Sequence, residues 1–551
     1  MLKSFKIEFN WMHYVILALT LIVFSRGLNN QFNNWDDTVY VTENPNITLN
    51  SKNSIQSFTK GEFHGMYVPI TALSLSVNHY FSELNPKPYL ITNLLIHLLN
   101  CILVFIVLQK LFKEKWLTLF VGALFALHPM QVESVSYVAG RRDVLYVLFF
   151  LIAIIHYLNY KETQQKKYIQ YTFLFFMLSL FSKGQAIALP FTLILIDYIT
   201  DKPFHIKQSA KDKLWFLAVA VVFIVITLLV KQQSKDFNLS GDITEISFGM
   251  KTLFAAYGFM MYIINLIVPF NLSLIHPYPK EIAISASLIA ALVFIGVLLV
   301  AIWKYRKTQP YIVFGLLFFI INIFLVLQII PNSYGIMNDH YVYFAGIGIF
   351  ISLYFLLKQL INSASTLSYL LIGVSFIMTA LSFIRVPVFK DSITVFTDVI
   401  KKYPNAYVAY NNRGNEYFNK GKANEALADY NKALSIKNNI PNSLSNRAAI
   451  YINMGKYNEA LEDVNKAILH KPDLANAYTN RGIIKTMTKA PGALEDMNKA
   501  ISLEPNNAKF YYNRAGYYMQ TNQKELACAD VQKAKQMGLT QGSPMLENLC
   551  K

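Results

Sequence analysis

Two adjacent acidic residues, Asp36 and Asp37, are the residues of this sequence best suited to chemistry. They follow the first long apolar run, in the segment FNNWDDTVYV (residues 32–41). A carboxylate there can act as a general base toward an acceptor hydroxyl, or as a ligand for a cation that bridges a phosphate. The structural alternative is an Asx turn that caps a helix. Two acids side by side just beyond an apolar run favour the catalytic interpretation.

A pair of arginines, Arg141 and Arg142, supplies matching positive charge in VAGRRD (residues 138–143). The planar guanidinium donates two parallel hydrogen bonds, a geometry that suits phosphate oxygens. A lone arginine beside an apolar run is more often an interface anchor. Because the acids Glu133 and Asp143 lie nearby, a functional cluster is as good an interpretation here as an interface anchor.

Other ionisable residues stand beside later apolar runs. Lys183 lies in FSKGQ, and Asp339 and His340 open a late run in NDHYVY. Charges at membrane depth are costly, so they usually pair with one another or serve function. His128 precedes a proline and indicates a helix-end group rather than a ligand. Asp197 lies so near the end of its run that a solvated interface position is the better interpretation.

The composition indicates an integral membrane protein with several spans. Of 551 residues, 54% are hydrophobic and 15% are charged, and the mean hydropathy is +0.33, which exceeds what a water-facing globular surface allows. The formal net charge is +17, but the basic residues cluster in short segments between apolar runs, as membrane topology explains. The sequence has no recognisable nucleic-acid-binding module, so we expect no nucleic-acid partner.

Apolar runs recur along the first 385 residues and predict helices that cross about 30 Å of hydrocarbon. The eleven expected spans are Trp11–Leu28, Leu90–Leu111, Trp116–Leu127, Val144–Tyr160, Tyr168–Phe181, Ala186–Ile199, Leu214–Val230, Ile282–Trp303, Tyr311–Ile330, Tyr341–Leu357 and Tyr369–Phe383. A twelfth run, Leu253–Val268, is expected to be re-entrant or interfacial. A full crossing would put Lys304, Arg306 and Lys307 outside, against the preference of basic residues for the cytoplasm.

This topology predicts a cytoplasmic N-terminus and a C-terminal domain outside, in the periplasm of a bacterial inner membrane. The candidate residues then gather at the outer face: Asp36, Glu133, Arg141, Asp143, Lys183, Asp339 and His340. The first outer loop, Arg26–Pro88, contains a half-apolar stretch, Tyr67–Phe81. This stretch indicates an interfacial helix that could roof a groove at the bilayer surface.

The last third of the sequence contains an internal repeat. An Asn-Arg-Gly or Asn-Arg-Ala triplet starts at Asn412, Asn446, Asn480 and Asn513, with spacings of 34, 34 and 33 residues. The alanines that keep step with it are Ala426, Ala460, Ala493, Ala527, Ala433, Ala467, Ala500 and Ala534. Small residues at these positions let paired helices pack closely, which is the tetratricopeptide (TPR) pattern. The third repeat departs from the pattern, with Lys485 where a tyrosine is expected and APG at residues 490–492.

Eight motifs occur in a fixed order along the membrane part. They are WDD (35–37), YVPIT (67–71), TNLLIHLLN (92–100), HP (128–129), Glu133, GRRD (140–143), SK (182–183) and DHY (339–341). With the repeats that follow, this order resembles the transmembrane and tetratricopeptide-repeat-containing O-mannosyltransferases and their bacterial relatives. The resemblance spans nearly the whole chain.

The resemblance implies the GT-C glycosyltransferase fold, an all-α polytopic membrane bundle followed by a TPR α-solenoid. Residues 1–385 would form the membrane domain, 386–405 a linker helix and 406–551 four repeats. The donor would be a polyprenyl-phosphate-linked sugar, transfer would invert the anomeric carbon, and Asp36 or Asp37 would be the base. The residues implied to hold the donor phosphate are Arg141, Arg142 and Lys183, and those implied to support the site are Glu133, Asp143, His128, Asp339 and His340.

Two departures leave the specificity open. Gly184 stands where relatives often have a glutamate, and His340 where an arginine is common, so mannose is one candidate sugar and a protein, held by the repeats, one candidate acceptor. A divalent cation, Mg²⁺ or Mn²⁺, on Asp36 or Asp37 is a further option. Two other functions remain as alternatives: a non-catalytic membrane-anchored scaffold for protein–protein interaction, and a GT-C enzyme that modifies a lipid or a surface glycan.

Overall fold

The computed structural model describes residues 8–44, 46–49, 62–63, 66–201, 203–233, 246–279, 282–329 and 334–539. Ile330, the last residue of one expected span, and residues 540–551 of the expected repeat domain lie outside these ranges. The chain forms two compact units, Met1–Tyr403 and Pro404–Lys551. Both units are helical, which confirms the all-α prediction of a membrane bundle followed by a solenoid.

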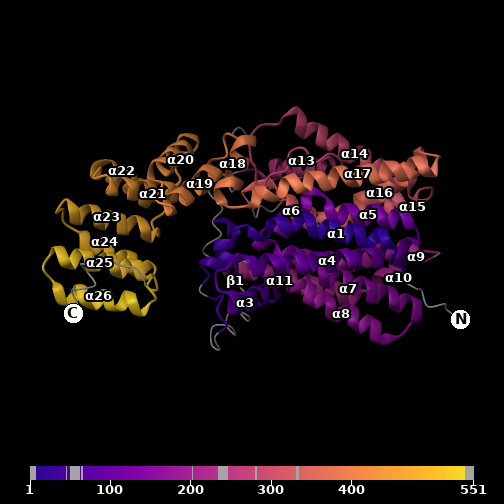
Figure 1. Cartoon of the computed structure of the whole chain (residues 1–551), viewed down its shortest axis with the longest axis horizontal. Coiled ribbons are helices and arrows are strands. Elements are labelled where there is room, and N and C mark those ends of the chain that lie inside the picture. The colour runs from indigo at the N-terminus through magenta and orange to yellow at the C-terminus, as the bar shows by residue number, and fades with distance from the viewer. Residues whose placement is uncertain are drawn as a thin grey trace. The chain divides into compact units, whose positions relative to one another are not determined.

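The helices of the first unit are labelled in Figure 1 where there is room. They are α1 (Trp11–Ser25), α3 (Pro69–Ser82), α4 (Pro86–Phe112), α5 (Lys115–Leu127), α6 (Val132–Ser136), α7 (Arg141–Thr163), α8 (Lys166–Leu180), α9 (Leu189–Thr200), α10 (Ile206–Lys211), α11 (Leu214–Gln233), α13 (Phe248–Ile267), α14 (Ala286–Tyr305), α15 (Pro310–Ile323), α16 (Gly346–Leu360), α17 (Ala364–Arg385) and α18 (Ser392–Lys402).

Short turns and strands connect these helices. The 3₁₀ and π turns are η1 (Arg26–Asn29), η2 (Thr38–Thr42), η3 (Pro129–Gln131), η4 (Val138–Gly140), η5 (Gly184–Ala188), η6 (Phe324–Val326), η7 (Asp339–Val342) and η8 (Val386–Phe389). Two antiparallel pairs of very short strands complete the described part, β1 (Glu62–Phe63) with β2 (Met66–Tyr67) and β3 (His276–Pro277) with β4 (Gly335–Met337).

Contacts between helix termini define two ends of the bundle. The end that carries Asp36, called the site end, is joined by hydrogen bonds from Arg142 to Asp36, from Arg141 to the Tyr89 carbonyl and from Ser382 to the Leu127 carbonyl. The opposite end, called the far end, is joined by Lys110 with Glu162, Tyr354 with Glu114, and Tyr198 with the Arg306 carbonyl. These pairs show which end of each helix lies at which end of the bundle.

Helices α4, α5 and α7 contribute contacts at both ends of the bundle: Tyr89 and Lys110 of α4, the Leu127 carbonyl of α5 with Glu114 directly before that helix, and Arg142 and Glu162 of α7. By length and composition, the segments that can each cross a membrane are Trp11–Asn29, Pro86–Phe112, Phe248–Ile267, Ala286–Tyr305 and Ala364–Phe389. Shorter apolar helices form Lys115–Leu127, Gly184–Thr200, Leu214–Val230, Pro310–Val326 and Gly346–Leu360. The unit is therefore a multi-pass membrane bundle.

Helix α13 covers the run that was expected to be re-entrant or interfacial. Its Phe254 packs with Tyr278 and with Leu288 at the start of α14. Near its other end, the Leu266 carbonyl lies 3.2 Å from Nε2 of His128, at the site end. Helix α13 is itself long and apolar enough to cross a membrane, so the expectation that this run does not cross stays a prediction.

Helix α3 occupies the stretch predicted to be interfacial, and it begins at Pro69. Leu73, Val77 and Phe81 on one side are exposed, while Leu75 is fully buried. An apolar face that the protein leaves uncovered suits contact with lipid at the bilayer surface. The Thr71 hydroxyl donates to the Ser182 carbonyl at 2.8 Å, so α3 also fixes the loop that carries Lys183.

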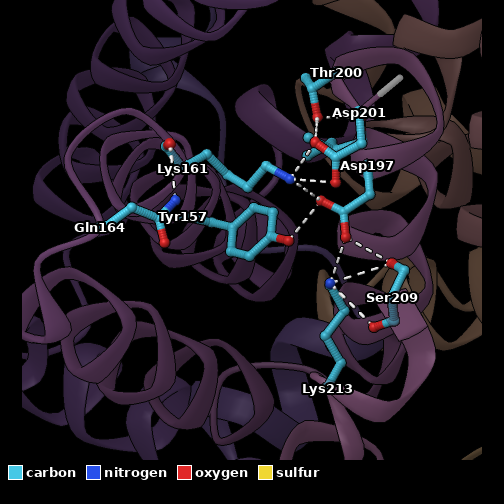
Figure 2. A network of polar contacts seen from close by, with 9 residues as sticks. Tyr157, Lys161, Gln164, Asp197, Thr200, Asp201, Ser209 and Lys213 are labelled. Carbon is cyan, nitrogen blue, oxygen red and sulfur yellow. Dashed lines mark hydrogen bonds and ion pairs between the residues drawn. The ribbon is translucent and has the colours of Figure 1, made fainter. Parts of the chain in front are cut away.

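A buried polar network fixes the far end (Figure 2). Asp197 is 3% exposed and accepts hydrogen bonds from Lys213 at 2.5 Å, Lys161 at 3.1 Å, Tyr157 at 2.6 Å and Ser209 at 2.6 Å. The prediction of a solvated Asp197 is wrong, because these four donors replace water around the carboxylate. The network joins α10 and α11 to the ends of α7 and α9.

The segment expected as a linker belongs to the membrane unit. It consists of η8 and α18, and Val395, Phe396 and Val399 of α18 are fully buried. The boundary between the two units falls later, between Tyr403 and Pro404.

The second unit is a stack of helix pairs. The pairs are α19 (Tyr407–Asn419) with α20 (Ala423–Ile436), α21 (Pro441–Asn453) with α22 (Tyr457–His470), α23 (Ala475–Met487) with α24 (Ala493–Leu503), and α25 (Ala508–Gln520) with α26 (Lys524–Gln536). Seven of the eight repeated alanines have no exposed surface and Ala493 has 4%. Close helix packing at these positions is confirmed.

Each repeat also contains a partly buried ion pair. The triplet arginine donates from Nε and Nη2 to both carboxylate oxygens of an aspartate in the second helix, at 2.6–2.9 Å: Arg413 with Asp429, Arg447 with Asp463, Arg481 with Asp496, and Arg514 with Asp530. In the third repeat Lys485 adds a second cation, 2.7 Å from Asp496. This contact explains a lysine at a position where the other repeats have tyrosine.

Candidate active site

Asp36 is the more accessible member of the acidic pair. Its side chain is 27% exposed, and its Oδ2 accepts a hydrogen bond from Nη2 of Arg142 at 2.6 Å. Nη1 of the same arginine donates to the Tyr40 hydroxyl at 2.7 Å. The Tyr137 hydroxyl accepts from the Asp36 backbone N–H at 2.7 Å. The carboxylate is therefore held in place, and the hydrogen bonds described leave its Oδ1 available to a substrate.

Asp37 is fully buried, and its carboxylate accepts hydrogen bonds from backbone N–H groups. Its Oδ2 accepts the N–H of Asn33 at 2.9 Å, and its Oδ1 accepts the N–H of Ala139 at 2.8 Å. Burial raises the pKa of this carboxyl well above its ordinary value of 3.8. The loop after α1 is thereby joined to η4, the turn that precedes Arg141. Asp37 is thus a structural residue, although not the helix cap that the alternative interpretation expects, because its side chain accepts no N–H group of η2. Asp36 retains the features of a base.

Arg141 and Arg142 have separate roles. Arg141 is fully buried and donates to Asn93 at 2.6 Å, Ser74 at 2.7 Å, Asn78 at 2.8 Å and the Tyr89 carbonyl at 2.9 Å. All three of its guanidinium nitrogens are occupied by neutral acceptors of α3 and α4. Arg141 therefore connects three helices, and a phosphate would have to displace these partners to reach it.

Lys183 lies beside the first turn of α7. Its ammonium group forms an ion pair with Asp143, and its side chain is 10% exposed. The Nζ atom lies 5.2 Å from the centre of the Tyr341 ring. Burial lowers the pKa of Lys183 below its ordinary value of 10.5. Because Asp143 follows Arg142 directly, the two cations Lys183 and Arg142 are brought to the same turn of α7.

Glu133 and His340 form a second buried pair, although 207 positions separate them in sequence. Nδ1 of His340 lies 2.5 Å from Oε1 of Glu133, and the residues are 7% and 4% exposed. Burial raises the pKa of Glu133. A narrow hollow beside the pair is lined by Glu133, Tyr137, Ala139, Gly140, Arg142, Asp143 and His340.

Two predicted supporting residues lie outside this hollow. Asp339 accepts a hydrogen bond from the Ser273 N–H at 2.7 Å and lies 2.9 Å from Nε2 of His276. His128 is fully buried; its Nδ1 accepts from the Met130 N–H at 3.2 Å. Asp339 thus connects β3 to η7, and His128 caps the turn after α5.

The acidic pair does not suit a divalent cation. Mg²⁺ and Mn²⁺ need several oxygen ligands directed at one point. Both Asp37 oxygens already accept backbone N–H groups, and Asp36 is paired with the guanidinium of Arg142. Within the ranges that the structure describes, no group of three or more His, Cys, Asp or Glu side chains could hold a metal ion.

The sequence did not single out Tyr40, Tyr137 or Gly140 for a site role. Tyr40 is fixed by Arg142, and Tyr137 by Asp36. A Cβ on Gly140 would lie 2.3 Å from the Ser134 carbonyl oxygen, so only glycine allows this turn. The glycine directly before the two arginines was the one feature of the sequence that could have indicated this tight turn.

Family models match the second unit. A model described as TPR repeat matches residues 414–455, and one described as tetratricopeptide repeat matches residues 441–474. Solved structures that match include YrrB, described as a TPR protein with an unusual peptide-binding site (19% identity, 28% of this chain, 78% of that chain, TM-score 0.23). Another is TTC0263, a thermophilic TPR protein from Thermus thermophilus (15% identity, 32% and 91%, TM-score 0.26).

Curated relatives agree with the resemblance seen in the motifs. Human protein O-mannosyl-transferase TMTC3 is 35% identical over 98 residues, which are 18% of this chain and 11% of the relative. Drosophila melanogaster protein O-mannosyl-transferase Tmtc1 is 25% identical over 206 residues, 36% of this chain and 23% of the relative. Human TMTC1 is 26% identical over 153 residues, 26% and 17%. The matched part of this chain thus spans less than a quarter of these relatives' length.

Proposed function

We propose that this protein is a membrane glycosyltransferase that moves a sugar from a polyprenyl-phosphate-linked donor to an acceptor hydroxyl. The observation that carries the proposal is the partly exposed carboxylate of Asp36, held by Arg142 at the site end of a lipid-embedded bundle. Lys183 places a second cation at the same turn of α7. The curated relatives named protein O-mannosyl-transferases support mannose as the sugar and a protein as the acceptor.

The transfer step follows from these side chains. Asp36 accepts the proton of the acceptor hydroxyl while the hydroxyl oxygen forms a bond to the anomeric carbon. The bond between that carbon and the phosphate oxygen breaks, and its electron pair leaves with the polyprenyl phosphate. Arg142 and Lys183 stabilise the negative charge that develops on the phosphate. Attack from the side opposite the leaving group inverts the anomeric carbon.

The outer, periplasmic face of a bacterial inner membrane is the proposed location of the site. Basic residues gather in the segments at the far end of the bundle: Lys110, Lys113, Lys166, Lys167, Lys207, Lys304, Arg306 and Lys307. Since basic loops stay in the cytoplasm, the far end is cytoplasmic and the site end is outside. The membrane unit ends at the site end, and the repeats follow it in the chain. The repeats would bind the acceptor protein and so raise its concentration near Asp36.

Replacing Asp36 by Asn tests the proposal. We expect transfer of labelled sugar from a polyprenyl-phosphate donor, measured in membranes that contain the full chain, to fall by about 10²–10⁴-fold, the usual contribution of a general base. Asp398→Asn is the matched control, because Asp398 is also a partly exposed aspartate paired with an arginine, Arg385, at 2.7 Å. This control is expected to stay within about twofold of wild type.

Two results would contradict the proposal. Transfer at the wild-type rate by the Asp36→Asn protein would show that Asp36 is not the base. Absence of transfer from every lipid-linked sugar, with the repeats still able to capture a partner, would instead support the scaffold alternative. Separation of the labelled product into protein, lipid and glycan fractions identifies the acceptor.

A further inference from the structure

Three of the residues that line the hollow beside α7 each have a buried polar atom that lacks a hydrogen-bond partner among the described residues. They are Oε2 of Glu133, Nε2 of His340 and Nε of Arg142. The three residues are 4%, 7% and 8% exposed, and all three line the hollow. Each of them uses its other polar atoms: Glu133 and His340 bind each other, and Arg142 binds Asp36 and Tyr40.

Unsatisfied polar atoms are rare inside proteins, because a buried donor or acceptor without a partner destabilises the fold. Three of them around one space indicate groups that a ligand satisfies. In this structure the hollow is too narrow to admit a water molecule. A ligand group as small as a hydroxyl therefore reaches the three residues only when the walls of the hollow move apart.

The chemistry of the three atoms discriminates between ligands. Oε2 of Glu133 accepts hydrogen bonds. Nδ1 of His340 faces the Glu133 carboxylate, so Nε2 is the ring nitrogen that is left for a ligand. Nε of Arg142 donates. A sugar hydroxyl both donates and accepts, so two neighbouring hydroxyls can satisfy this set.

Other ligands fit the set less well. A phosphate offers mainly acceptors, so it would match Arg142 but meet the Glu133 carboxylate unfavourably. A metal cation would match the Glu133 carboxylate but would be repelled by the guanidinium. A neutral polyol satisfies all three without either conflict.

We infer that Glu133 and His340, together with Nε of Arg142, bind neighbouring hydroxyls of the donor's sugar ring and so select and orient a neutral hexose. This inference rests on the proposed transferase function and names the part of the site that recognises the sugar. The pair then acts as a specificity-determining group, whereas Lys183 acts on the phosphate. The same guanidinium would join both parts, since Arg142 lines the hollow and also holds Asp36.

The test measures binding, independently of transfer. The purified full chain in detergent is titrated with citronellyl phosphate and with its mannosyl, glucosyl, galactosyl and N-acetylglucosaminyl esters, and tryptophan fluorescence reports the Kd. We expect one hexose ester to bind about tenfold or more tighter than citronellyl phosphate, as hydrogen bonds to charged groups allow. Glu133→Gln and His340→Asn should abolish this advantage and leave the Kd of citronellyl phosphate unchanged.

His276→Gln is the matched control, because His276 forms a buried pair with Asp339 outside the hollow. It should keep the sugar advantage. The inference is overturned if no ester binds tighter than citronellyl phosphate to the wild-type chain, or if both hollow variants keep the advantage. It is also overturned if they weaken all the ligands equally, as a purely structural role requires. A wild-type chain that binds the sugar but transfers none would instead refute the proposed function and leave this inference standing.

Discussion

Asp36 and Arg142, 106 positions apart in sequence, form an ion pair of 2.6 Å at the site end of the membrane bundle. The second terminal nitrogen of Arg142 donates to the Tyr40 hydroxyl at 2.7 Å. The guanidinium is thus fixed between two partners on the loop after α1. A permanent positive charge therefore accompanies the proposed base, and this relationship has consequences for cation dependence and pH dependence.

Transfer should not depend on a divalent cation. In the proposed transfer step Arg142 and Lys183, which are paired with Asp36 and Asp143, supply the positive charge that a metal would otherwise offer to the phosphate. We expect the rate in membranes treated with excess EDTA to stay within about twofold of the untreated rate, a small change beside the effect of removing a true electrostatic group. A loss on chelation that added Mg²⁺ or Mn²⁺ reverses would show that this prediction is wrong.

Transfer should decline in alkaline solution earlier than an ordinary lysine predicts. Burial lowers the pKa of Lys183 below 10.5, so its ammonium loses its proton, and its attraction for phosphate, at a pH below that value. The cationic form is complete at lower pH and disappears as pH rises through the lowered pKa. The pH–rate profile of the wild-type chain measures the midpoint.

Lys183→Arg provides the control for this effect. Arginine stays charged throughout the accessible pH range, so the alkaline decline should move to higher pH in this variant. An unchanged profile would assign the decline to another group.

Arg141→Lys should act on stability and Arg142→Lys on transfer. A lysine at 141 cannot reach the four acceptors that the guanidinium now satisfies, and each buried acceptor left without a donor costs about 1–3 kcal/mol. We expect the free energy of unfolding to fall by at least about 2 kcal/mol, seen as a lower melting temperature of the full chain in detergent. Lysine at 142 keeps one positive charge beside Asp36. Compared with Arg141→Lys, Arg142→Lys should therefore lower the melting temperature less and reduce the transfer rate more. Equal losses of stability would contradict the separation of roles.

Two nearly identical ion pairs in the repeats allow a test of whether Lys485 compensates for the loss of an arginine. In the second repeat Arg447 alone pairs with Asp463 among the described residues, whereas in the third repeat both Arg481 and Lys485 bind Asp496. Arg447→Met leaves a carboxylate that is 4% exposed without its cation, and it should destabilise the repeat by about 2–4 kcal/mol. Arg481→Met should cost less than half as much, because Lys485 remains.

Hydrogen exchange of the full chain, followed by mass spectrometry, measures this difference. Peptides of α21 and α22 should lose protection in the Arg447→Met protein. Peptides of α23 and α24 should keep most of theirs in the Arg481→Met protein. Equal losses in the two repeats would show that Lys485 does not compensate.

The sequence predicted the elements of this fold well because apolar runs and a repeat period are local signals. The buried alanines of the repeats and the helix in the stretch Tyr67–Phe81 agree with the structure. The sequence does not show which residues pair across the fold. The repeat period predicts that each repeat carries an arginine such as Arg413, but its aspartate partner, Asp429, becomes evident only when the second helix of the repeat folds back on the first.

The sequence predicted which residues gather at the site but did not predict what each of them does there. Neighbours such as Asp36 with Asp37, and Arg141 with Arg142, look alike in sequence because each pair shares one motif. Their environments differ because a one-residue step along a turn or a helix directs a side chain elsewhere. Asp197 was misplaced for a similar reason, since its partners Lys161 and Lys213 come from other helices.

The path of the first unit has a consequence for biosynthesis under the proposed topology. Between Trp11 and Tyr403 the described chain begins at the far end and finishes at the site end. If the far end is cytoplasmic, as proposed, the repeats that follow Tyr403 are synthesised in the cytoplasm and must cross the bilayer. A stack of packed helix pairs cannot pass through a translocation channel, so α19 to α26 would then be exported as an extended chain. Their arginine–aspartate pairs would form only after export, without help from the chaperones of the compartment in which the ribosome works.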